Sequence, residues 1–505
     1  MKLKMRLLDF DLGSHEIFLN AGDADRYGLK ALDRVVLLPN GNGEGVSSIV
    51  KIAHGSIPPG FVGIGKEQCE HFEAKEGADV TILPATRPKS VEYIRKKLDG
   101  KTLKGEEIRA IIEDIAKGNL TDIELTAYAC ATYTYDMNID EIVACIEAMV
   151  DTGERITFTR GPVLDVHSIG GVPGNKYAPI TVSIVAANGL MIPKTSSRAI
   201  SSACGTADFM EVVSPVVFPA EAIKRMTEQV GGTLCWGGGV NLAPADDAII
   251  RVEYPLSIDP HAQLLASVLA KKKAGGAQFV VIEMPTGEGA KVESEEKARA
   301  LARDFIAVGE RIGIKVQCAI TYGGQPIGRA IGPVLEIKEA MQVLEGSENP
   351  TSLIEKACSL AGILLELGGA AAKGEGYLLA RETLRSGKAL KKFREIIGAQ
   401  GGDPNLKSES LKPGPYHFDV KAIQHGYVES IANKKLNRIA RAAGSPRDKG
   451  AGLYLHLKKG RRVEIGEPIY TIYAEHEHKL KEAVALANQL NPFQIEGMVI
   501  EEVVE

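Results

Sequence analysis

The sequence predicts a multidomain α/β protein with a β-rich N-terminal domain, a helical domain, a central α/β domain and a C-terminal α+β domain. Three observations support this prediction. The length of 505 residues suggests roughly three domains, the hydrophobic period changes from strand-like to helical and back, and strand-like and helix-like runs alternate in the central part. The predicted domains are 1–86, 87–162, 163–409 and 410–505, with part of 245–275 joining the helical domain.

The first 86 residues contain short strand-like runs separated by Gly, Asn and Asp, which is typical of a small β domain. The segment Asp23–Leu29 is predicted to form a short helix that ends at a glycine. The predicted strands are Leu7–Leu12, His15–Leu19, Val35–Leu38 and Ser47–Ile52.

The next segment has a helical period. Ile108, Ile111, Ile112 and Ile115 recur at i, i+3, i+4 and i+7, which places them on one face of a helix. Thr121 is followed three residues later by Glu124, the spacing of a capping box that opens a second helix. A third apolar stripe is formed by Ile139, Ile142, Val143, Ile146 and Val150. The sequence therefore predicts a helical bundle here.

The central domain alternates between the two patterns, as in α/β proteins. Lys176–Asn188 is the predicted first helix, closed by a glycine. The predicted strands are Val163–Ser168, Thr233–Trp236, Phe279–Met284 and Lys315–Thr321. Beyond residue 410 the predicted strands are Tyr427–Val428, Leu453–Leu457 and Pro468–Tyr473, and the predicted terminal helix is Glu482–Leu490.

Composition excludes several classes of protein. The net charge of −5 gives no indication of a nucleic-acid or anionic-membrane partner, and no apolar run reaches the length of a membrane span. The first residues contain no long apolar stretch, so export is not expected. The seven cysteines are widely spaced and show no C-x-x-C pair, so reduced thiols in a cytoplasmic protein are expected.

The segment Lys194–Asp208 concentrates six hydroxyl side chains, two cations and small residues. Hydroxyl and backbone N–H groups donate hydrogen bonds to anions, Lys194 and Arg198 add positive charge, and small residues let the backbone approach closely. This mixture favours a loop that wraps an anion. An ordinary serine-rich loop is the alternative.

A second glycine-rich segment, Ser168–Lys176, follows a predicted strand and precedes a predicted helix. Backbone N–H groups at such a turn can bind phosphate, although a plain tight turn fits equally well. Asn175 stands where a Walker A loop requires glycine. This turn and the serine-rich segment are both entered from hydrophobic strands, so we expect them to form two walls of one cleft at the strand ends.

Four other residues carry possible chemistry. Asp259 precedes a proline at a predicted helix start, so helix capping competes with a role as proton donor. Capping favours the ionised carboxylate, whereas an apolar cleft favours the protonated acid. Ser267 and Lys271 share one helix face, although Lys271 could instead simply complement the negative end of its helix. Lys291 follows a glycine-rich turn, and its alternative is a solvated surface lysine.

His167 could act as a base, although a histidine inside a strand is more often a hydrogen-bonded core group. His476 and His478 lie among glutamates, which indicates an exposed segment. No His, Cys or carboxylate spacing predicts a metal site.

Several of these segments resemble the thymidine/pyrimidine-nucleoside phosphorylase family over about residues 88–505. The serine-rich segment is similar to the family signature, and the segment around His167 to its phosphate loop. The matching segments are Ser196–Ile200, Gly205–Asp208 with Glu211, His167–Val172, Ser267–Lys271 and Asp448–Leu453.

The chain differs from the nucleoside-specific members of this family in three ways, and in all three it resembles the archaeal-type subgroup that acts on nucleoside 5′-monophosphates. Members acting on nucleosides carry a lysine where this chain has Val166 and an apolar residue where it has Lys291, and they lack the N-terminal domain. The resemblance implies that this domain is a double-psi β-barrel that takes part in large assemblies. A nucleotide brings an additional dianion with which Lys291 could pair.

The resemblance implies a pentosyltransferase that converts AMP, and also CMP and UMP, with inorganic phosphate into free base and ribose 1,5-bisphosphate in nucleotide degradation. It implies Asp259 as the proton donor, no metal or organic cofactor, and a cytoplasmic homo-oligomer built on a dimer. The helical and α/β domains are expected to close over the cleft. Ser168, Ser196 and Lys176 are candidates for the inorganic-phosphate site. The implied AMP-binding residues are Gly171, Ser197, Arg198, Ala199, Ile200, Ser201, Ser202, Thr206, Ser267 and Lys291.

Three alternatives stay open at this point. A thymidine or uridine phosphorylase is disfavoured by Val166 and Lys291. A non-catalytic assembly protein would be expected to carry damaged anion loops, which this chain does not show. A phosphoribosyltransferase would require magnesium and nearby carboxylates, for which Asp208 and Glu211 are the candidates.

Overall fold

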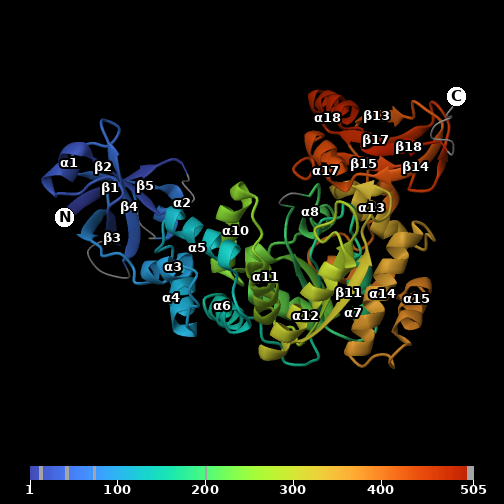
Figure 1. The fold of residues 1–505 in the computed structure, drawn as a ribbon, viewed down its shortest axis with the longest axis horizontal. Coiled ribbons are helices and arrows are strands. Elements are labelled where there is room, and N and C mark those ends of the chain that lie inside the picture. Colours follow the sequence, from blue (N-terminus) through green and yellow to red (C-terminus); the bar gives the residue numbers. More distant parts are fainter. Residues whose placement is uncertain (11–14, 40–44, 72–74, 200–201, 498–505) are drawn as a thin grey trace, which may run out of the picture. The chain divides into compact units, whose positions relative to one another are not determined.

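A computed structural model describes residues 1–10, 15–39, 45–71, 75–199 and 202–497 (Figure 1). The chain forms two compact units. The first comprises Met1–Thr152 and Ala243–Ser267, and the second comprises Gly153–Leu242 and Val268–Glu505. The predicted multidomain α/β class is confirmed, with a barrel, helices, parallel sheets and a C-terminal α+β part.

The N-terminal part of the first unit is a closed six-stranded barrel in the order β1-β5-β2-β4-β3-β6. Alternate residues of its strands, such as Leu3 and Met5, or Ile17 and Leu19, point into a buried apolar core. The strands are β1 (Lys2–Leu8), β2 (Glu16–Asn20), β3 (Arg34–Pro39), β4 (Val46–Ala53), β5 (Phe61–Gly65) and β6 (Asp79–Pro84), with helices α1 (Ala21–Arg26) and α2 (Lys66–His71) between them.

Two details of the N-terminal prediction are wrong. The first strand covers Lys2–Leu8 instead of Leu7–Leu12, because the alternation of Leu3 and Met5 with lysines sends alternate side chains to the core. Residues 11–12 of that predicted strand lie outside the described residues. The strands β5 and β6 were not predicted, although both pair with β1 and so close the barrel.

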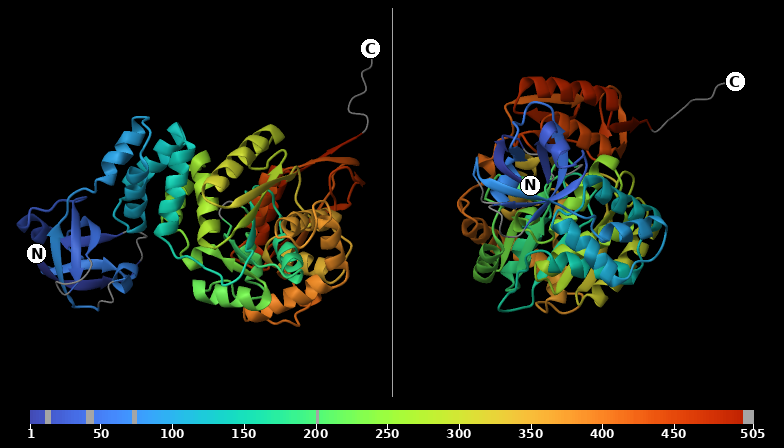
Figure 2. Two further views of the ribbon diagram at one scale, coloured as in Figure 1. Left: turned by 90° about the horizontal axis from the view of Figure 1, so that it is seen from below. Right: turned by 90° about the vertical axis from the view of Figure 1, so that its left-hand side faces the viewer.

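Helices complete the first unit, beside the barrel (Figure 2). The predicted apolar stripe of α4 is confirmed, since all four of its isoleucines are buried. The predicted capping box of α5 is confirmed as well: Thr121 Oγ1 accepts from Glu124 N at 3.2 Å, and Glu124 Oε2 accepts from Thr121 N at 2.8 Å. The helices are α3 (Ser90–Leu98), α4 (Gly105–Ala116), α5 (Asp122–Tyr135), α6 (Ile139–Asp151), α10 (Pro244–Leu256) and the start of α11 (His261–Ala274).

The second unit contains a parallel sheet in the order β11-β10-β7 and a parallel pair β8-β9. A parallel bridge between Val163 and Met191 joins the starts of β7 and β8. The predicted strands are confirmed, some with longer ends. The strands are β7 (Leu164–Ser168), β8 (Ile192–Ser196), β9 (Gly232–Trp236), β10 (Phe279–Thr286) and β11 (Lys315–Tyr322).

Helix α7 (Ala178–Ala187) forms the centre of the hydrophobic core, with every residue but its last buried. It starts two residues later than predicted. The helices α14 and α16 pack against it, which accounts for the absence of a polar face on α7. The other helices are α8 (Thr206–Met210), α9 (Ala220–Val230), α12 (Glu295–Arg311), α13 (Pro333–Leu344), α14 (Thr351–Leu367), α15 (Gly376–Arg385) and α16 (Lys388–Ala399).

The C-terminal part is α+β, as predicted. It contains two antiparallel sheets, β12-β15-β17-β13 and β16-β14-β18, packed with helices α17 and α18 around one core. Helix α18 begins five residues earlier than predicted. The elements are β12 (Ala330–Ile331), β13 (Tyr416–Lys421), β14 (Gly426–Ile431), α17 (Asn433–Ala442), β15 (Gly452–Leu455), β16 (Arg462–Val463), β17 (Pro468–Ala474), α18 (Glu477–Leu490) and β18 (Phe493–Glu496).

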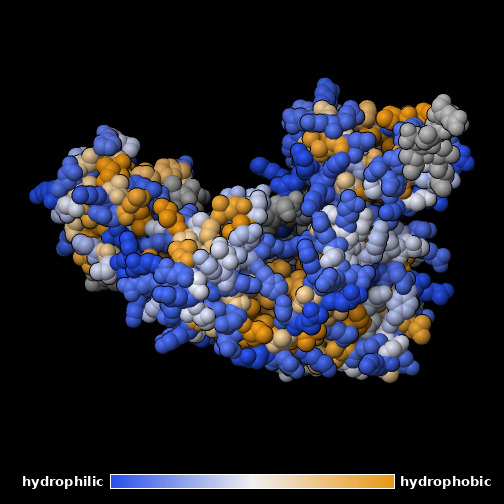
Figure 3. Space-filling view, in the orientation of Figure 1, coloured by the Kyte–Doolittle hydropathy of each residue, from blue (hydrophilic) through white to orange (hydrophobic). Residues whose placement is uncertain are grey.

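In the part of the chain that is described, no helix combines the length and apolar character needed to cross a bilayer. The face drawn in Figure 3 mixes hydrophilic residues with small groups of hydrophobic ones. All seven cysteines are free thiols.

Candidate active site

The glycine turn after β7 lies against the backbone of Lys291. Gly170 and Gly171 have φ values of 86° and 93°, which favour glycine. A Cβ on Gly171 would come within 2.4 Å of Lys291 N, so this position tolerates no larger residue without a shift of the backbone. Ser168 Oγ accepts from Gly170 N at 3.2 Å and fixes the start of the turn. The turn and the segment carrying Lys291 therefore form one surface.

The serine-rich segment continues from the carboxyl end of β8. Asp208 bridges the two ends of this loop, Ala199 and Gly205, which we call the loop neck. Asp208 Oδ2 accepts from Ala199 N at 2.7 Å and from Gly205 N at 3.0 Å. A Cβ on Gly205 would lie 2.7 Å from Ser197 O, so the two sides of the neck are in close contact. The carboxylate of Asp208 thus holds the ends of this loop together.

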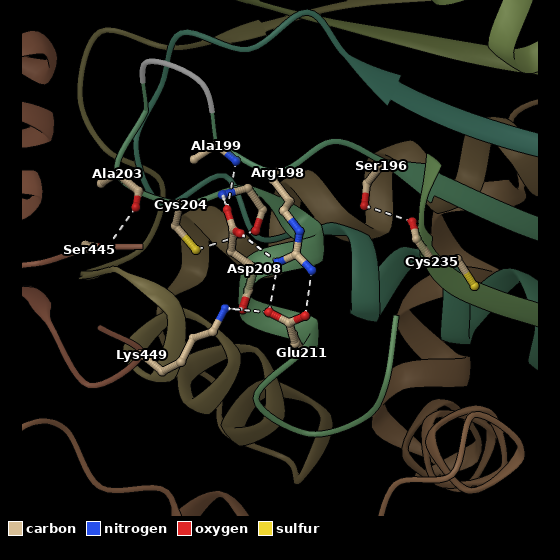
Figure 4. A network of polar contacts seen from close by, with 11 residues as sticks. Ser196, Arg198, Ala199, Ala203, Cys204, Asp208, Glu211, Cys235, Ser445 and Lys449 are labelled. Atoms are coloured by element: carbon tan, nitrogen blue, oxygen red, sulfur yellow. Dashed lines mark hydrogen bonds and ion pairs between the residues drawn. The ribbon is translucent and has the colours of Figure 1, made fainter. Parts of the chain in front are cut away.

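Arg198 braces the same loop (Figure 4). Its guanidinium forms two parallel hydrogen bonds with Glu211, of 2.8 and 2.5 Å, and a third of 3.3 Å with Asp208. It also lies over the Trp236 ring, 5.0 Å from the centroid. The hydrogen bond from Arg198 is the main cause that lowers the pKa of Glu211 to about 2, so this carboxylate stays ionised at neutral pH.

The C-terminal part also holds the serine-rich segment. Lys449 Nζ pairs with Glu211 Oε2 at 2.7 Å and donates to Asp208 O at 3.3 Å. Three more hydrogen bonds reach the loop: Ser445 Oγ to Ala203 O at 2.8 Å, Ala203 N to Asn437 Oδ1 at 3.1 Å, and Arg441 Nη1 to Ser202 O at 3.1 Å. The loop geometry therefore depends on residues more than 200 positions further along the chain.

Lysines gather around His167 near the end of β7. Burial, followed by the charges of four lysines, lowers the pKa of His167 well below its usual value, so its imidazole is neutral at physiological pH. These lysines are Lys272, Lys194, Lys271 and Lys291. The pKa of His167 is therefore lowered both by Lys194, the first residue of the serine-rich segment, and by Lys291.

Lys176 is a structural residue. Its ammonium is fully buried and donates to Gly174 O, Ile327 O and Ala330 O, each at 2.9 Å. It also pairs with Glu339 at 2.8 Å. Because these oxygens use all the donor capacity of the ammonium, Lys176 does not fit the suggested role in phosphate binding.

Among the described residues, one group of three potential metal ligands is found: Asp448, Glu475 and His476. Asp448 Oδ2 pairs with Lys479 at 2.6 Å, and Glu475 Oε1 accepts from Gly450 N at 2.6 Å. These carboxylates therefore already have structural partners.

Three family models match the chain in succession. The helical bundle domain of the glycosyl transferase family matches residues 91–153, the α/β domain of that family matches residues 160–390, and the C-terminal domain of pyrimidine nucleoside phosphorylases matches residues 427–493. These matches follow the helical, α/β and α+β parts of the fold.

Relatives that align over nearly the whole chain show which family it belongs to. AMP phosphorylase of Methanosarcina mazei is 51% identical over 500 residues, which cover 99% of this chain and 98% of that protein. The chain belongs to the AMP phosphorylase family. AMP phosphorylase 1 of Archaeoglobus fulgidus is 49% identical over 501 residues, which cover 99% of both chains. The N-terminal barrel lies within both alignments, so it is shared by these AMP phosphorylases.

Anthranilate phosphoribosyltransferase of Thermus thermophilus has a similar fold. The match has a TM-score of 0.51 at 21% identity and covers 61% of this chain and 99% of that enzyme. At this identity the likeness concerns the fold alone.

The AMP-contact residues expected from sequence are divided between the two units. Asp259 and Ser267 belong to the first unit. Asp259 is exposed in the connection before α11, which starts at His261 with the Pro260 carbonyl as the first acceptor. Ser267 Oγ donates to Asp246 Oδ2 at 2.7 Å. The contact roles of both residues in an AMP phosphorylase stay predictions.

The second unit contains the other residues of that set. Ile200 and Ser201 lie outside the described residues. Gly171 and Lys291 are adjacent, and Ser197, Arg198, Ala199, Ser202 and Thr206 line the loop or open α8. Both terminal nitrogens of Arg198 are engaged by carboxylates, so its observed role is to support the loop, and its contact with AMP stays a prediction.

The role of several residues in holding the loop was not predicted. Asp208 and Glu211 lie in the signature segment and Lys449 in a C-terminal segment that also resembles the family, but nothing in the sequence indicated that they hold the loop. Asn437 and Ser445 carried no prediction. Because these contacts are formed by tertiary packing, a single sequence contains no periodicity that reveals them.

Replacing Lys449 by methionine is expected to raise KM for AMP about ten-fold with a smaller change in kcat. Loss of a charge-assisted hydrogen bond of roughly 1.5–3 kcal/mol to Glu211 would let the serine-rich segment move. Steady-state kinetics with varied AMP would measure this. The exposed Lys459 provides the matched control, Lys459→Met, and equal effects in the two variants would show that Lys449 does not act through the loop.

Proposed function

We propose that the protein catalyses the reversible phosphorolysis of AMP to adenine and ribose 1,5-bisphosphate. Membership of the AMP phosphorylase family supports the substrate. The observation that carries the proposal is that the backbone of Lys291 lies against Gly171 in the turn after β7, because this places a cation beside a glycine turn of the kind that binds phosphate.

The proposed chemistry follows from the bonds involved. An oxygen of inorganic phosphate attacks C1′ of the ribose, while the bond from C1′ to the base breaks through an oxocarbenium-like state. The departing base keeps the electron pair and takes a proton, for which Asp259 is the proposed donor. Hydroxyl and backbone donors of the glycine turn and the serine-rich segment would orient the attacking phosphate.

Lys291 is the proposed partner of the 5′-phosphate of AMP. It is exposed, and its backbone lies against Gly171, so the lysine is presented at the edge of the glycine turn. A phosphate group at this position would form a charge-assisted contact that a nucleoside cannot provide. This supports a nucleotide over thymidine or uridine as the substrate.

The carboxylates nearest the loop have other tasks. Asp208 holds the loop neck, and Glu211 pairs with Arg198 and Lys449. These contacts support a reaction with inorganic phosphate as co-substrate over a magnesium-dependent transfer that uses the same carboxylates as ligands. No organic cofactor forms part of the proposal.

Three further points belong to the proposal. CMP and UMP are expected to be additional substrates. The protein is expected to act as a homo-oligomer built on a dimer, with the N-terminal barrel contributing to larger assemblies. The seven free cysteines support a cytoplasmic location.

A base-release assay tests the proposal. With inorganic phosphate present, AMP is expected to release adenine and form ribose 1,5-bisphosphate, and omission of phosphate should abolish release. Adenosine is the control, expected to react at least about a hundred-fold more slowly because it lacks the group that Lys291 binds. Equal turnover of AMP and adenosine would contradict the nucleotide assignment.

A further inference from the structure

Two lysine ammonium groups share one backbone oxygen at the carboxyl end of β8. Lys194 Nζ donates to Thr195 O at 2.5 Å, and Lys272 Nζ donates to the same oxygen at 3.2 Å. Both side chains are nearly inaccessible, with 4% of Lys194 and 2% of Lys272 exposed. The mechanism above does not use either of them.

Only part of this buried charge is neutralised within the described chain. Lys272 Nζ pairs with Asp165 Oδ2 at 2.5 Å, and the other oxygen of Asp165 accepts from Val166 N at 2.7 Å. In the described ranges, no carboxylate forms an ion pair with Lys194. The carboxylate of Asp165 thus faces the ammonium groups of both Lys272 and Lys194.

Such an arrangement is costly unless an anion completes it, because burial of unpaired charge is unfavourable. Burial and the charge of Lys272 lower the pKa of Lys194 to about 7, while Asp165 opposes this shift. His167 is neutral, so it neither adds to the positive charge of the two lysines nor offsets it. A bound dianion would compensate the excess positive charge and keep Lys194 protonated.

The position also suits an anion. Parallel strands direct their carboxyl ends to the ligand side of an α/β sheet, and β7 ends at Ser168 immediately before the Gly170–Gly171 turn. A small, untethered anion can enter a buried position, whereas the exposed Lys291 suits a phosphate attached to a nucleoside. We propose that Lys194 binds the inorganic phosphate that attacks C1′.

This inference rests on the proposed function and adds the residue that holds the second phosphate. In the reaction, a phosphate oxygen held by Lys194 forms the bond to C1′, and the bond from C1′ to the base breaks with its electron pair leaving on the base. Lys194 stays protonated throughout and contributes electrostatic stabilisation and orientation.

The test is a kinetic comparison of Lys194→Met with the wild type. Loss of the ammonium is expected to raise KM for inorganic phosphate at least about ten-fold, while KM for AMP stays within about two-fold. Lys194→Arg should recover part of the phosphate affinity. An unchanged KM for phosphate, or equal increases in both KM values, would overturn the assignment.

Lys458→Met provides the matched control. Lys458 is a half-buried lysine, burial also lowers its pKa to about 7, and its ammonium donates to backbone oxygens, including Gly328 O at 2.9 Å. Its removal is expected to leave the ratio of the two KM values unchanged. A rise in the phosphate KM of this control would show that loss of any buried lysine produces the effect.

A binding measurement complements the kinetics. Millimolar inorganic phosphate alone is expected to raise the Tm of the wild type and to have little effect on Lys194→Met, while AMP raises the Tm of both. Lys194→Gln serves the same purpose if the methionine variant does not fold. A phosphate-induced Tm shift equal to that of the wild type would contradict the inference.

The two proposals fail in different ways. If the wild type releases no adenine from AMP, the proposed function is wrong. If the wild type is active and the phosphate KM does not respond to position 194, the proposed function stands and only the role of Lys194 is rejected.

Discussion

Replacing Asp259 by asparagine is expected to lower kcat for AMP phosphorolysis about 10²- to 10⁴-fold, the range of a positioned general acid. Asparagine has nearly the same shape but cannot donate the required proton to the departing adenine. KM for AMP should change much less than kcat. Single-turnover measurement of adenine release would separate this chemical step from product release.

An altered substrate distinguishes proton donation from a structural role. An AMP analogue methylated at N7 carries a cationic base that departs without taking a proton, so wild type and Asp259→Asn should process it at similar rates. Asp99→Asn, at an exposed aspartate of the same unit, is the control and should retain wild-type kinetics. A near-normal kcat of Asp259→Asn with AMP would assign this residue to the start of α11 instead of catalysis.

Replacing Lys291 by alanine is expected to lower kcat/KM for AMP about a hundred-fold and to leave the low activity on adenosine unchanged. The reason is the loss of a charge-assisted contact with the 5′-phosphate, of roughly 1.5–3 kcal/mol. The comparison of the two substrates is the measurement, because a general defect would lower both activities together.

A nearby lysine supplies the control for this experiment. Lys297 is exposed on the first turn of α12, six residues further along the chain. Lys297→Ala should preserve kcat/KM for AMP. If Lys291→Ala retained wild-type discrimination between AMP and adenosine, another residue would have to bind the 5′-phosphate.

Local patterns in the sequence predicted much of the secondary structure. The isoleucine stripe of α4 and the Thr121–Glu124 capping box depend on neighbours within one or two helical turns, so their signals are present in any short window. The α/β alternation was equally visible. The strands β5 and β6 were missed because barrel closure depends on pairing with β1, from which they are separated by more than 50 residues.

The candidate site was predictable only in part. The concentration of hydroxyl groups between Lys194 and Asp208 singled out the loop by residue type alone. Its chemistry is implied by the resemblance to a known signature and stays a prediction. The role of Asp208 in holding the ends of the loop together and the pairing of Arg198 with Glu211 depend on how α8 and the turn after it lie against the residues that follow β8. A residue type predicts which contacts are available, and packing selects among them.

The sequence by itself determined the multidomain α/β class and most helices and strands, because these follow from hydrophobic period and local side-chain chemistry. The anion-binding character of the serine-rich segment stays a prediction from its residue types. The tertiary structure decided how the buried lysines are paired. Lys176 is satisfied by four oxygens inside the protein, whereas Lys194 and Lys272 meet across two strands and a helix with one carboxylate between them. The net charge of a buried cluster depends on groups brought together from distant positions in the chain, and no single stretch of sequence contains that sum.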